Sequence, residues 1–287
     1  MADRKGWVLT VTCPDTVGII STVTGFLSQH ECFITDASQY GDPLSRRFFL
    51  RVVFLPGAMT PPIPELEKLF TIVAARFQMI WQMHDASRKA KVVILVSKFG
   101  HCLNDLLHRY QSGSLPIEIP AVISNHPDMQ GIVEWHGIPY HYFPADKNDK
   151  AAQEAKVLEV IDRAGADLVV LARYMQILSH DMCVRLQGRA INIHHSFLPS
   201  FKGAKPYHQA HARGVKIIGA TAHYVTADLD EGPIIEQGVE RVDHTLTPED
   251  LVALGRDIEN VVLARAVRWH TEHRVLLNGS RTVVFRG

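Results

Sequence analysis

Two short runs of aliphatic residues, Val92–Ser97 and Asp167–Ala172, are apolar along almost their whole length. Strands that are apolar on both faces are typical of a parallel sheet that helices cover on both sides. Helices are expected nearby at Asn104–Gln111 and Asp149–Ala164, so strands and helices alternate along this part of the chain. The alternation predicts an open, mostly parallel α/β sheet, in which binding sites lie beyond the carboxyl ends of the strands.

Weaker signals complete this second region. A long helix is expected to begin at Thr247–Asp250 and to run to about Glu272, because threonine caps a helix, proline fits its first turn and acidic residues favour its N-terminus. The pair Asn278 and Gly279 predicts the tight turn of a terminal hairpin. The remaining strands are expected at Ala121–Ser124, Pro139–Phe143, Ala190–Ile193, Ile217–Thr226 and Ile234–Val242.

The N-terminal part of the chain has a different order of elements. Its strands are expected at Trp7–Thr12, Cys32–Ser38, Arg47–Phe54 and Gln78–His84. One helix follows the first strand and a second is expected at Pro64–Phe77, which gives the βαββαβ order of the ferredoxin-like fold. A polar, basic linker follows at residues 86–91. We therefore expect an N-terminal domain at residues 1–85 and a second domain at residues 92–287.

Charge and cysteine content disfavour several classes of protein. The chain has 30 basic and 30 acidic residues, whereas nucleic-acid and membrane-surface binding rest on excess positive charge. No run of about 18 apolar residues is present, so no membrane span is expected. Four cysteines without a Cys-x-x-Cys pair predict reduced thiols in a cytoplasmic protein. His208 and His211 have helical spacing, and we interpret them as a solvated helix face rather than a metal site.

Three residues of the second region carry the chemistry of acyl transfer. Asn192 and His194 lie at the carboxyl end of an expected strand, and Asp230 follows the next strand. An amide can donate to a tetrahedral oxyanion, an imidazole can exchange a proton with a leaving group, and a carboxylate can orient the imidazole or a water. Asn192, His194 and Asp230 are therefore the candidate catalytic residues. Asp230 is expected to position and to deprotonate a water, and no metal is expected.

The sequence around these residues resembles the folate-dependent formyltransferase/hydrolase family, which includes glycinamide ribonucleotide formyltransferase and methionyl-tRNA formyltransferase. The resemblance rests on residues 191–203, 219–225 and 228–235. It implies a Rossmann-like domain of the formyltransferase type in which Asn192, His194 and Asp230 are catalytic. It also implies that 10-formyltetrahydrofolate is the substrate and that no separate cofactor takes part.

Residues 1–85 resemble an ACT domain, a small module for regulation and assembly. In such modules the turn between the first strand and the first helix often lies beside an amino-acid ligand, so Asp15 and Gly18 are candidate regulatory residues. The resemblance implies an amino-acid effector and a homo-oligomer, either a dimer or a tetramer. An ACT domain joined to a formyltransferase-like domain is the arrangement of the hydrolase branch of the family.

The family resemblance also places the folate against the loop at residues 173–178, which follows a buried strand. Backbone groups of Gln176 and Leu178 are expected to bind the edge of the pterin. Met175 and Ile177 either line the pterin cavity or belong to the ordinary core.

A second folate segment is expected to run from Val225 to Asp230. His223 is expected beside the catalytic residues, and His195 has either a role on the water side of the reaction or a packing role. Lys202 and Lys205 are either surface charges or ligands of the glutamate tail.

Two features distinguish the chain from the transferases of the family. Glycinamide ribonucleotide formyltransferase carries a Gly/Ser-rich loop that holds the phosphate of the acceptor, whereas Ser97–Cys102 has one glycine and several bulky side chains. His195 stands where the transferases typically carry proline. Both features favour water as the acceptor and predict hydrolysis to tetrahydrofolate and formate, which would balance one-carbon pools for purine biosynthesis.

Three alternatives stay open at this point. The chain could transfer the formyl group to an amine, bind folate or an amino acid as a non-catalytic sensor, or use its histidine-rich surface as a metal-dependent hydrolase.

Overall fold

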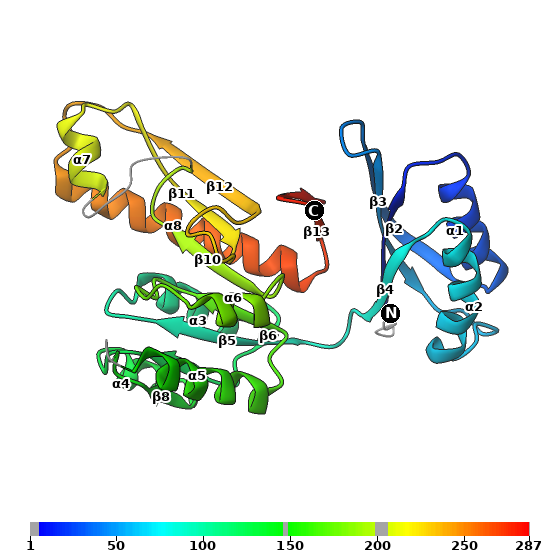
Figure 1. The fold of residues 1–287 in the computed structure, drawn as a ribbon, viewed down its shortest axis with the longest axis horizontal. Coiled ribbons are helices and arrows are strands. Elements are labelled where there is room, and N and C mark those ends of the chain that lie inside the picture. The colour runs from blue at the N-terminus through cyan, green and yellow to red at the C-terminus, as the bar shows by residue number, and fades with distance from the viewer. Residues whose placement is uncertain (1–5, 146–148, 199–205, 287) are drawn as a thin grey trace. The chain divides into compact units, whose positions relative to one another are not determined.

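The fold was analysed in a computed structural model, which describes residues 6–145, 149–198 and 206–286. The chain divides into two compact units (Figure 1). The first comprises Met1–Arg88, Glu272–Asn278 and Thr282–Gly287, and the second comprises Lys89–Thr271 and Gly279–Arg281. Each unit has its own sheet, so each is described by itself.

The first unit is an antiparallel sheet with two helices. Its elements are β1 (Trp7–Pro14), α1 (Ile19–Gln29), β2 (Phe33–Asp42), β3 (Arg47–Leu55), α2 (Ile63–Arg76) and β4 (Ile80–Asp85). The strand order is β2-β3-β1-β4, and every neighbouring pair is antiparallel. This arrangement confirms the expected ferredoxin-like βαββαβ fold.

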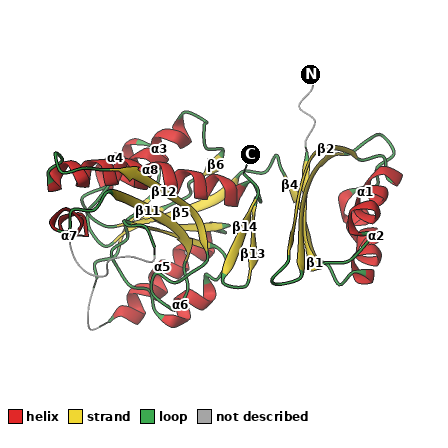
Figure 2. Cartoon of the chain, turned by 90° about the horizontal axis from the view of Figure 1, so that it is seen from above, coloured by secondary structure: helices red, strands yellow, loops and turns green. Residues whose placement is uncertain are grey.

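Both helices of the first unit cover one face of its sheet (Figure 2). Alternate residues of β1, among them Leu9 and Val11, are fully buried because successive strand residues point to opposite faces. Val23 of α1 and Phe70 of α2 are fully buried against the same face. The period-2 and period-3.6 patterns of the sequence therefore meet in one core.

The C-terminal hairpin belongs to the first unit. Its strands are β13 (Val275–Asn278) and β14 (Arg281–Val284). Phe49 of β3 is fully buried in a cluster with Leu276 and Phe285 of the hairpin segment. Asn278 Nδ2 also donates to Asp42 Oδ2 over 2.7 Å. The sequence predicted this hairpin within the domain at 92–287. The hairpin instead packs against the helix-free face of the β2-β3-β1-β4 sheet, because burying Phe49 on that face removes apolar surface from water.

The second unit is a mostly parallel sheet with helices on both sides. Its strands are β5 (Ala90–Val96), β6 (Ile117–Glu118), β7 (Val122–Ser124), β8 (Tyr140–Tyr142), β9 (Leu168–Leu171), β10 (Ala190–His194), β11 (Ile217–Tyr224) and β12 (Ile234–Arg241). Its helices are α3 (His101–Gln111), α4 (Gln130–Trp135), α5 (Lys150–Ala164), α6 (His180–Arg185), α7 (Pro206–Ala212) and α8 (Pro248–Thr271). Figure 2 shows α3 and α8 on one side of the sheet and α5 and α6 on the other.

The strand order of this sheet places the candidate catalytic residues at a functional edge. The order is β12-β11-β10-β9-β5-β7-β8, parallel from β8 to β10 and antiparallel for β11 and β12. Residues 92–96 of β5 are fully buried, as the continuous apolar run predicted. The chain reverses its direction of progress along the sheet at β5, where β7 lies on one side and β9 on the other. Ligand sites of such folds lie at this switch, beyond the carboxyl ends of the strands.

Two expectations about the chain as a whole bear on its environment. In the part of the chain that the structure describes, no helix is both long and apolar enough to cross a bilayer. All four cysteines, Cys13, Cys32, Cys102 and Cys183, are buried and free.

Substitution of Leu276 tests whether the hairpin supports the first unit. Leu276 is 7% exposed, whereas its neighbour Leu277 is 44% exposed because it points to the opposite face of β13. We expect Leu276→Ala to lower the free energy of unfolding of the first unit by about 2–5 kcal/mol. Urea unfolding monitored by tryptophan fluorescence measures this change. Leu277→Ala is the matched control, and equal losses for the two variants would contradict a docked hairpin.

Candidate active site

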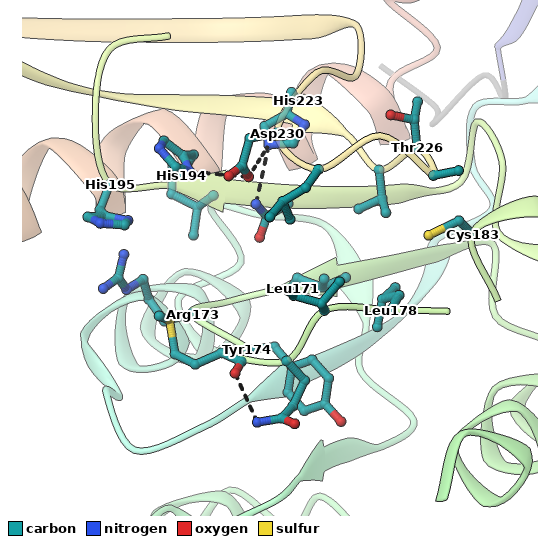
Figure 3. Close-up of a pocket in the computed structure, with 18 residues that line it drawn as sticks. Leu171, Arg173, Tyr174, Leu178, Cys183, His194, His195, His223, Thr226 and Asp230 are labelled. Carbon is teal, nitrogen blue, oxygen red and sulfur yellow. Dashed lines mark hydrogen bonds and ion pairs between the residues drawn. The ribbon is translucent and has the colours of Figure 1, made fainter. Parts of the chain in front are cut away.

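A cavity of about 240 Å³ opens beyond the carboxyl ends of β9 and β10 (Figure 3). It is lined by parts of β9, β10 and β11 and by the loops that follow β9 and β11. The structure brings together in this cavity ten of the residues that the sequence predicted for catalysis and folate binding: Asn192, His194, Asp230, Met175, Gln176, Ile177, Leu178, Val225, His223 and His195. Residues separated by up to 55 positions therefore share one site.

The central contact of the site joins His194 and Asp230. Nδ1 of His194 lies 3.2 Å from Oδ1 of Asp230, and the two side chains are 13% and 28% exposed. His194 ends β10, while Asp230 lies in the loop between β11 and β12 with a left-handed φ of 60°. A non-glycine residue rarely adopts this conformation, so the surrounding loop must hold the carboxylate in place.

Hydrogen bonds keep Asp230 ionised. The bond from His194, and after it the contact with His223, hold the pKa of the Asp230 carboxyl well below its usual range, although partial burial acts in the opposite direction. Such a carboxylate accepts hydrogen bonds strongly but is a weak base. Asp230 is therefore suited to orienting its partners throughout the neutral pH range.

A second imidazole fixes the amide of Asn192. Nδ1 of His223 lies 2.9 Å from the backbone oxygen of Tyr224, so this nitrogen carries the proton and donates. Nε2 of neutral His223 then accepts from Nδ2 of Asn192 over 3.2 Å. Asn192 and His223 face each other across the antiparallel pair β10 and β11. Since an amide nitrogen carries two N–H groups, one remains for a ligand.

The contact between His223 and Asp230 is longer. Nε2 of His223 lies 3.7 Å from the same Oδ1 that His194 contacts. This distance exceeds that of a hydrogen bond, and the Nε2 lone pair of the neutral ring is already used by Asn192. We therefore assign His223 to holding the amide, and its effect on the Asp230 pKa comes second to that of His194.

A glycine allows the Asp230 loop to close on β11. A Cβ atom at Gly232 would lie 1.7 Å from the backbone oxygen of Tyr224, so no side chain fits there. The same segment is tied down by a hydrogen bond from the Tyr224 amide to the Pro233 carbonyl over 2.9 Å. The sequence analysis noted Gly232 only as part of a motif; its close approach becomes visible in three dimensions alone.

His195 lines the cavity as a neutral imidazole. Its ring centre lies 4.8 Å from that of His194. Burial, followed by the charges of Arg173 and His194, lowers the pKa of His195 to about 4. The imidazole is therefore neutral near pH 7 and contributes a polar group without a charge.

The loop after β9 forms the floor of the cavity. Met175 and Ile177 are 53% and 63% exposed, so they are lining residues of an open pocket and do not belong to the packed core. The backbone amide of Gln176 already donates to the Tyr174 carbonyl over 2.9 Å. A ligand edge would therefore use other backbone groups of this loop, among them those of Leu178.

Four predicted residues lie elsewhere, and two are not described. Asp15 and Gly18 lie in the β1–α1 turn of the first unit; the Asp15 amide donates to the Arg46 carbonyl, and Gly18 has a φ of 95°. His208 and His211 of α7 are exposed, which agrees with a solvated helix face. Lys202 and Lys205 lie outside the described residues.

Other lining residues received no individual role from their sequence. Leu171 and Cys183 lie outside the two predicted folate segments, whereas Arg173, Tyr174, Thr226 and Leu229 lie within them. Arg173 is the most distinctive of these because it is a cation with a positive φ of 63°. A basic residue directly after a buried strand is a sequence signal that could have drawn attention to it.

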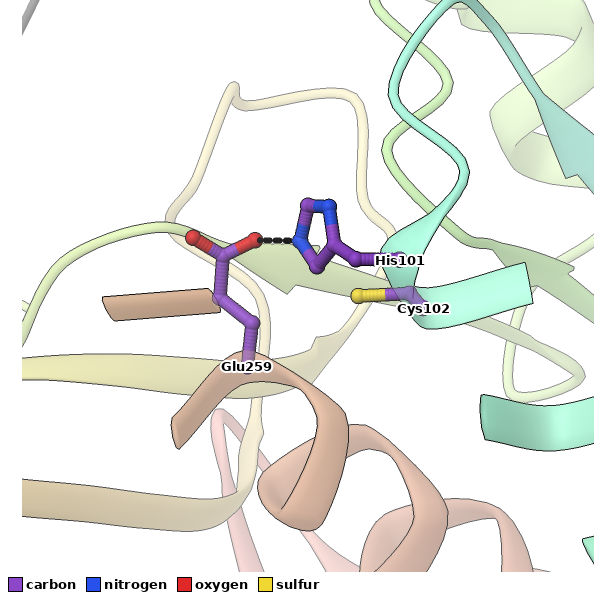
Figure 4. Close-up of side chains that lie close together, drawn as sticks. All are labelled: His101, Cys102 and Glu259. Carbon is purple, nitrogen blue, oxygen red and sulfur yellow. Dashed lines mark hydrogen bonds and ion pairs between the residues drawn. The ribbon is translucent and has the colours of Figure 1, made fainter. Parts of the chain in front are cut away.

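A buried cluster behind the cavity has the composition of a metal site but not its electrostatics (Figure 4). His101, Cys102 and Glu259 place ligand atoms within 4.8 Å of one another. However, His101 Nε2 already contacts Glu259 Oε2 over 2.7 Å, and the Arg173 cation lies 3.5 Å from that same oxygen. Burial, and after it the charge of Glu259, raises the pKa of the Cys102 thiol and disfavours the thiolate that a metal would need. A structural ion-pair cluster fits these observations better than a metal centre.

Comparison with known proteins agrees with this geometry. Residues 90–267 match the formyl transferase family. The chain is 56% identical over 286 residues to the formyltetrahydrofolate deformylase of Corynebacterium sp. (strain P-1), with 100% of both chains covered. It is 50% identical to the formyltetrahydrofolate deformylase of Bacillus subtilis, covering 99% of this chain and 94% of the relative.

Solved structures show the same relationship. The formyltetrahydrofolate deformylase of Burkholderia mallei superposes with a TM-score of 0.94 and 54% identity, covering 98% of this chain and 100% of that one. The glycinamide ribonucleotide transformylase of Symbiobacterium toebii superposes with a TM-score of 0.65 and 31% identity, covering 71% of this chain and 97% of that one. The fuller match is to the deformylases, and the chain belongs to the formyltetrahydrofolate deformylase family.

Proposed function

We propose that the chain hydrolyses 10-formyltetrahydrofolate to tetrahydrofolate and formate. The observation that carries this proposal is the convergence of Asn192, His194 and Asp230 in one cavity of a chain that belongs to the deformylase family. The alternative, transfer of the formyl group to an amine, is not favoured because the relatives that match the whole chain are named deformylases.

The contact between His194 and Asp230 supports a specific path for the proton. With Nδ1–H donated to Asp230, the Nε2 atom of neutral His194 is an acceptor. Nε2 takes a proton from a water as the water oxygen attacks the formyl carbon. The bond from carbon to N10 then breaks, and the imidazolium returns the proton to N10. The formyl group leaves as formic acid, which ionises to formate in neutral water.

The oxyanion of this reaction needs donors that are already in position. Asn192 has one N–H held by His223 and a second one for the oxygen of the tetrahedral intermediate. The imidazolium form of His194 adds a positive charge during the same step. Because His223 holds the amide before substrate binds, little reorganisation is needed when the negative charge develops.

Asp230 receives a narrower role than the sequence analysis gave it. That analysis expected Asp230 both to position and to deprotonate the water. Its pKa lies below the usual carboxyl range and its Oδ1 faces two imidazoles, so proton abstraction is assigned to His194. Asp230 fixes the tautomer of His194 and stabilises the imidazolium, as the carboxylate does in other His–carboxylate pairs.

The apolar end of the cavity suits the pterin ring. Leu171, Leu178 and Cys183 lie away from the histidines in Figure 3. Met175 and Ile177 add exposed apolar surface from the loop after β9, and Val225 adds more after β11. A flat heterocycle that lies here would direct its N10 substituent toward His194 and Asn192.

We further propose that the first unit is an ACT-like module for assembly and regulation, with Asp15 and Gly18 beside an amino-acid effector. Its outer strands β2 and β4 expose Phe33 and Ile80, which are 67% and 70% accessible and suit pairing between copies. We place the activity in the cytoplasm, where the released formate would serve purine biosynthesis.

A formate assay tests the main proposal. Purified chain is incubated with 10-formyltetrahydrofolate alone, and formate and tetrahydrofolate are quantified. We expect equal amounts of the two products without any added amine. Formate release that depends on an amine, or an absence of turnover, would refute hydrolysis.

Substitutions of the catalytic residues test the mechanism. Asn192→Ala removes one oxyanion donor and should lower kcat by roughly 10²–10³-fold. Asp230→Ala should lower kcat further, because Asp230 both fixes the tautomer of His194 and stabilises its imidazolium form. Steady-state kinetics with 10-formyltetrahydrofolate measures both. Glu231→Ala, at an exposed carboxylate of the same loop, is the matched control. Near-normal activity of Asp230→Ala would rule out this assignment.

Assembly and effector binding can be measured on the whole chain. Sedimentation equilibrium is expected to give a dimer or a tetramer. A panel of amino acids, scanned by thermal unfolding, is expected to contain at least one that raises the Tm of the wild type but not that of Asp15→Ala. A monomer would contradict the assembly role, and an unchanged Tm across the panel would contradict the regulatory one.

A further inference from the structure

Arg173 is a largely buried cation at the reacting end of the cavity, and the mechanism described above does not use it. It follows β9, lines the cavity and is 11% exposed. Figure 3 places its guanidinium beside His195, at the end where His194 lies, whereas Leu178 and Cys183 lie at the other end. Its backbone φ of 63° is unusual for a residue with a long side chain. The chain therefore accepts local strain at the position that brings this charge to the site.

Glu259 forms an ion pair with Arg173 but does not satisfy the hydrogen-bonding capacity of its guanidinium. Nε of Arg173 lies 3.5 Å from Oε2 of Glu259, close enough for an ion pair but too far for a good hydrogen bond. Among the described residues, Nε has no hydrogen-bond partner although the atom is buried. The face of the Phe99 ring lies 5.7 Å from the guanidinium and restricts its movement.

Glu259 itself is committed to other partners. It is 1% exposed, and its two oxygens accept from His101 Nε2 over 2.7 Å and from the Tyr207 hydroxyl over 3.1 Å. These bonds from α3 and α7 hold the carboxylate on α8 in one position. The carboxylate compensates the buried charge of Arg173, while the planar fork of the guanidinium stays available to a ligand.

Two other polar groups that line the cavity, His195 and Asp230, do not compete for that ligand. The charge of Arg173 acts on His195 and, together with burial, keeps this imidazole neutral near pH 7. Asp230, the anion of the site, is held by His194. An anion that forms beside His194 therefore faces Arg173, the only arginine or lysine among the described residues that line the cavity.

The two possible acceptors give products of different charge at this place. Transfer of the formyl group to an amine gives a neutral formamide. Hydrolysis gives a carboxylate, whose two oxygens match the paired N–H groups of a guanidinium. The inference rests on the proposed hydrolysis: we propose that Arg173 forms a carboxylate subsite that binds the formate product beside His194.

The subsite also explains why Glu259 is buried behind the cavity. An unopposed arginine in this position would favour any anion and would be costly to bury. With Glu259 fixed at 3.5 Å, the arginine keeps one face toward its counter-ion and one toward the product. The cluster of His101, Tyr207 and Glu259 thus acts through Arg173 as a set of positioning residues.

Product inhibition of the full-length chain tests the subsite. Sodium formate is titrated against 10-formyltetrahydrofolate turnover at constant ionic strength, with sodium chloride as the balancing salt. The variants are Arg173→Gln, which removes the charge, and Arg173→Lys, which keeps a cation opposite Glu259 but loses the fork. Arg185→Gln is the matched control, since Arg185 of α6 forms a surface ion pair with Asp162 and is 54% exposed.

We expect formate to inhibit the wild type and Arg185→Gln equally and more strongly than chloride. Arg173→Gln should raise the inhibition constant for formate roughly tenfold or more, as expected for the loss of charge-assisted hydrogen bonds. Arg173→Lys should give a smaller increase with the Tm close to that of the wild type. Inhibition by tetrahydrofolate, which occupies the apolar end, should be unchanged in every variant.

Three results would overturn the subsite: formate that inhibits the wild type no better than chloride, an unchanged formate constant in Arg173→Lys and Arg173→Gln, or equal shifts for formate and tetrahydrofolate. These outcomes are distinct from failure of the proposed function. If the wild type releases no formate from 10-formyltetrahydrofolate, hydrolysis itself is refuted; if it does, only the role of Arg173 is in question.

Discussion

The chemistry of the cavity depends on one carboxylate oxygen, Oδ1 of Asp230, which lies between two imidazoles. The nearer ring, His194, gives up its Nδ1–H to this oxygen and is left with a basic Nε2. The farther ring, His223, is turned by the Tyr224 carbonyl so that its own Nε2 serves Asn192 instead. The two histidines therefore have different roles: Nε2 of His194 is left free to accept a proton, whereas Nε2 of His223 accepts from Asn192. The difference arises because Nδ1 of His194 donates to Asp230 and Nδ1 of His223 donates to the Tyr224 carbonyl.

Much of the fold follows from patterns that are local in sequence. The apolar run at residues 92–96 favoured a strand buried on both faces, and the order of strands and helices then predicted a parallel sheet with its site at the carboxyl ends. The packing of the terminal hairpin could not be predicted in this way. The hairpin covers Phe49, which lies more than 200 positions earlier, and nothing in the hairpin sequence indicates this contact. Short elements such as α4 and α6, with six residues each, are too brief for periodicity to reveal.

The candidate site was predictable to the extent that it is made of motif residues. The residue types of Asn192, His194 and Asp230, and their positions at or after the ends of strands, indicate acyl-transfer chemistry. Arg173 and Glu259 do not, because a single arginine or glutamate in a sequence is most often a surface charge. Their proximity arises from the packing of α8 against the loop after β9, and only the folded chain brings a buried carboxylate within 3.5 Å of a guanidinium.

The close approach of Gly232 to the Tyr224 carbonyl has a consequence for how such a site can change over evolutionary time. The backbone of the loop that carries Asp230 is placed by main chain against main chain, not by the side chains that line the cavity. Lining residues such as Leu229, Thr226 and Met175 can therefore vary, and with them the shape of the bound ligand, while the geometry of the reaction stays fixed. The residues that select the ligand are therefore separate from the backbone contact that places the Asp230 loop. A change in substrate preference need not disturb the catalytic step.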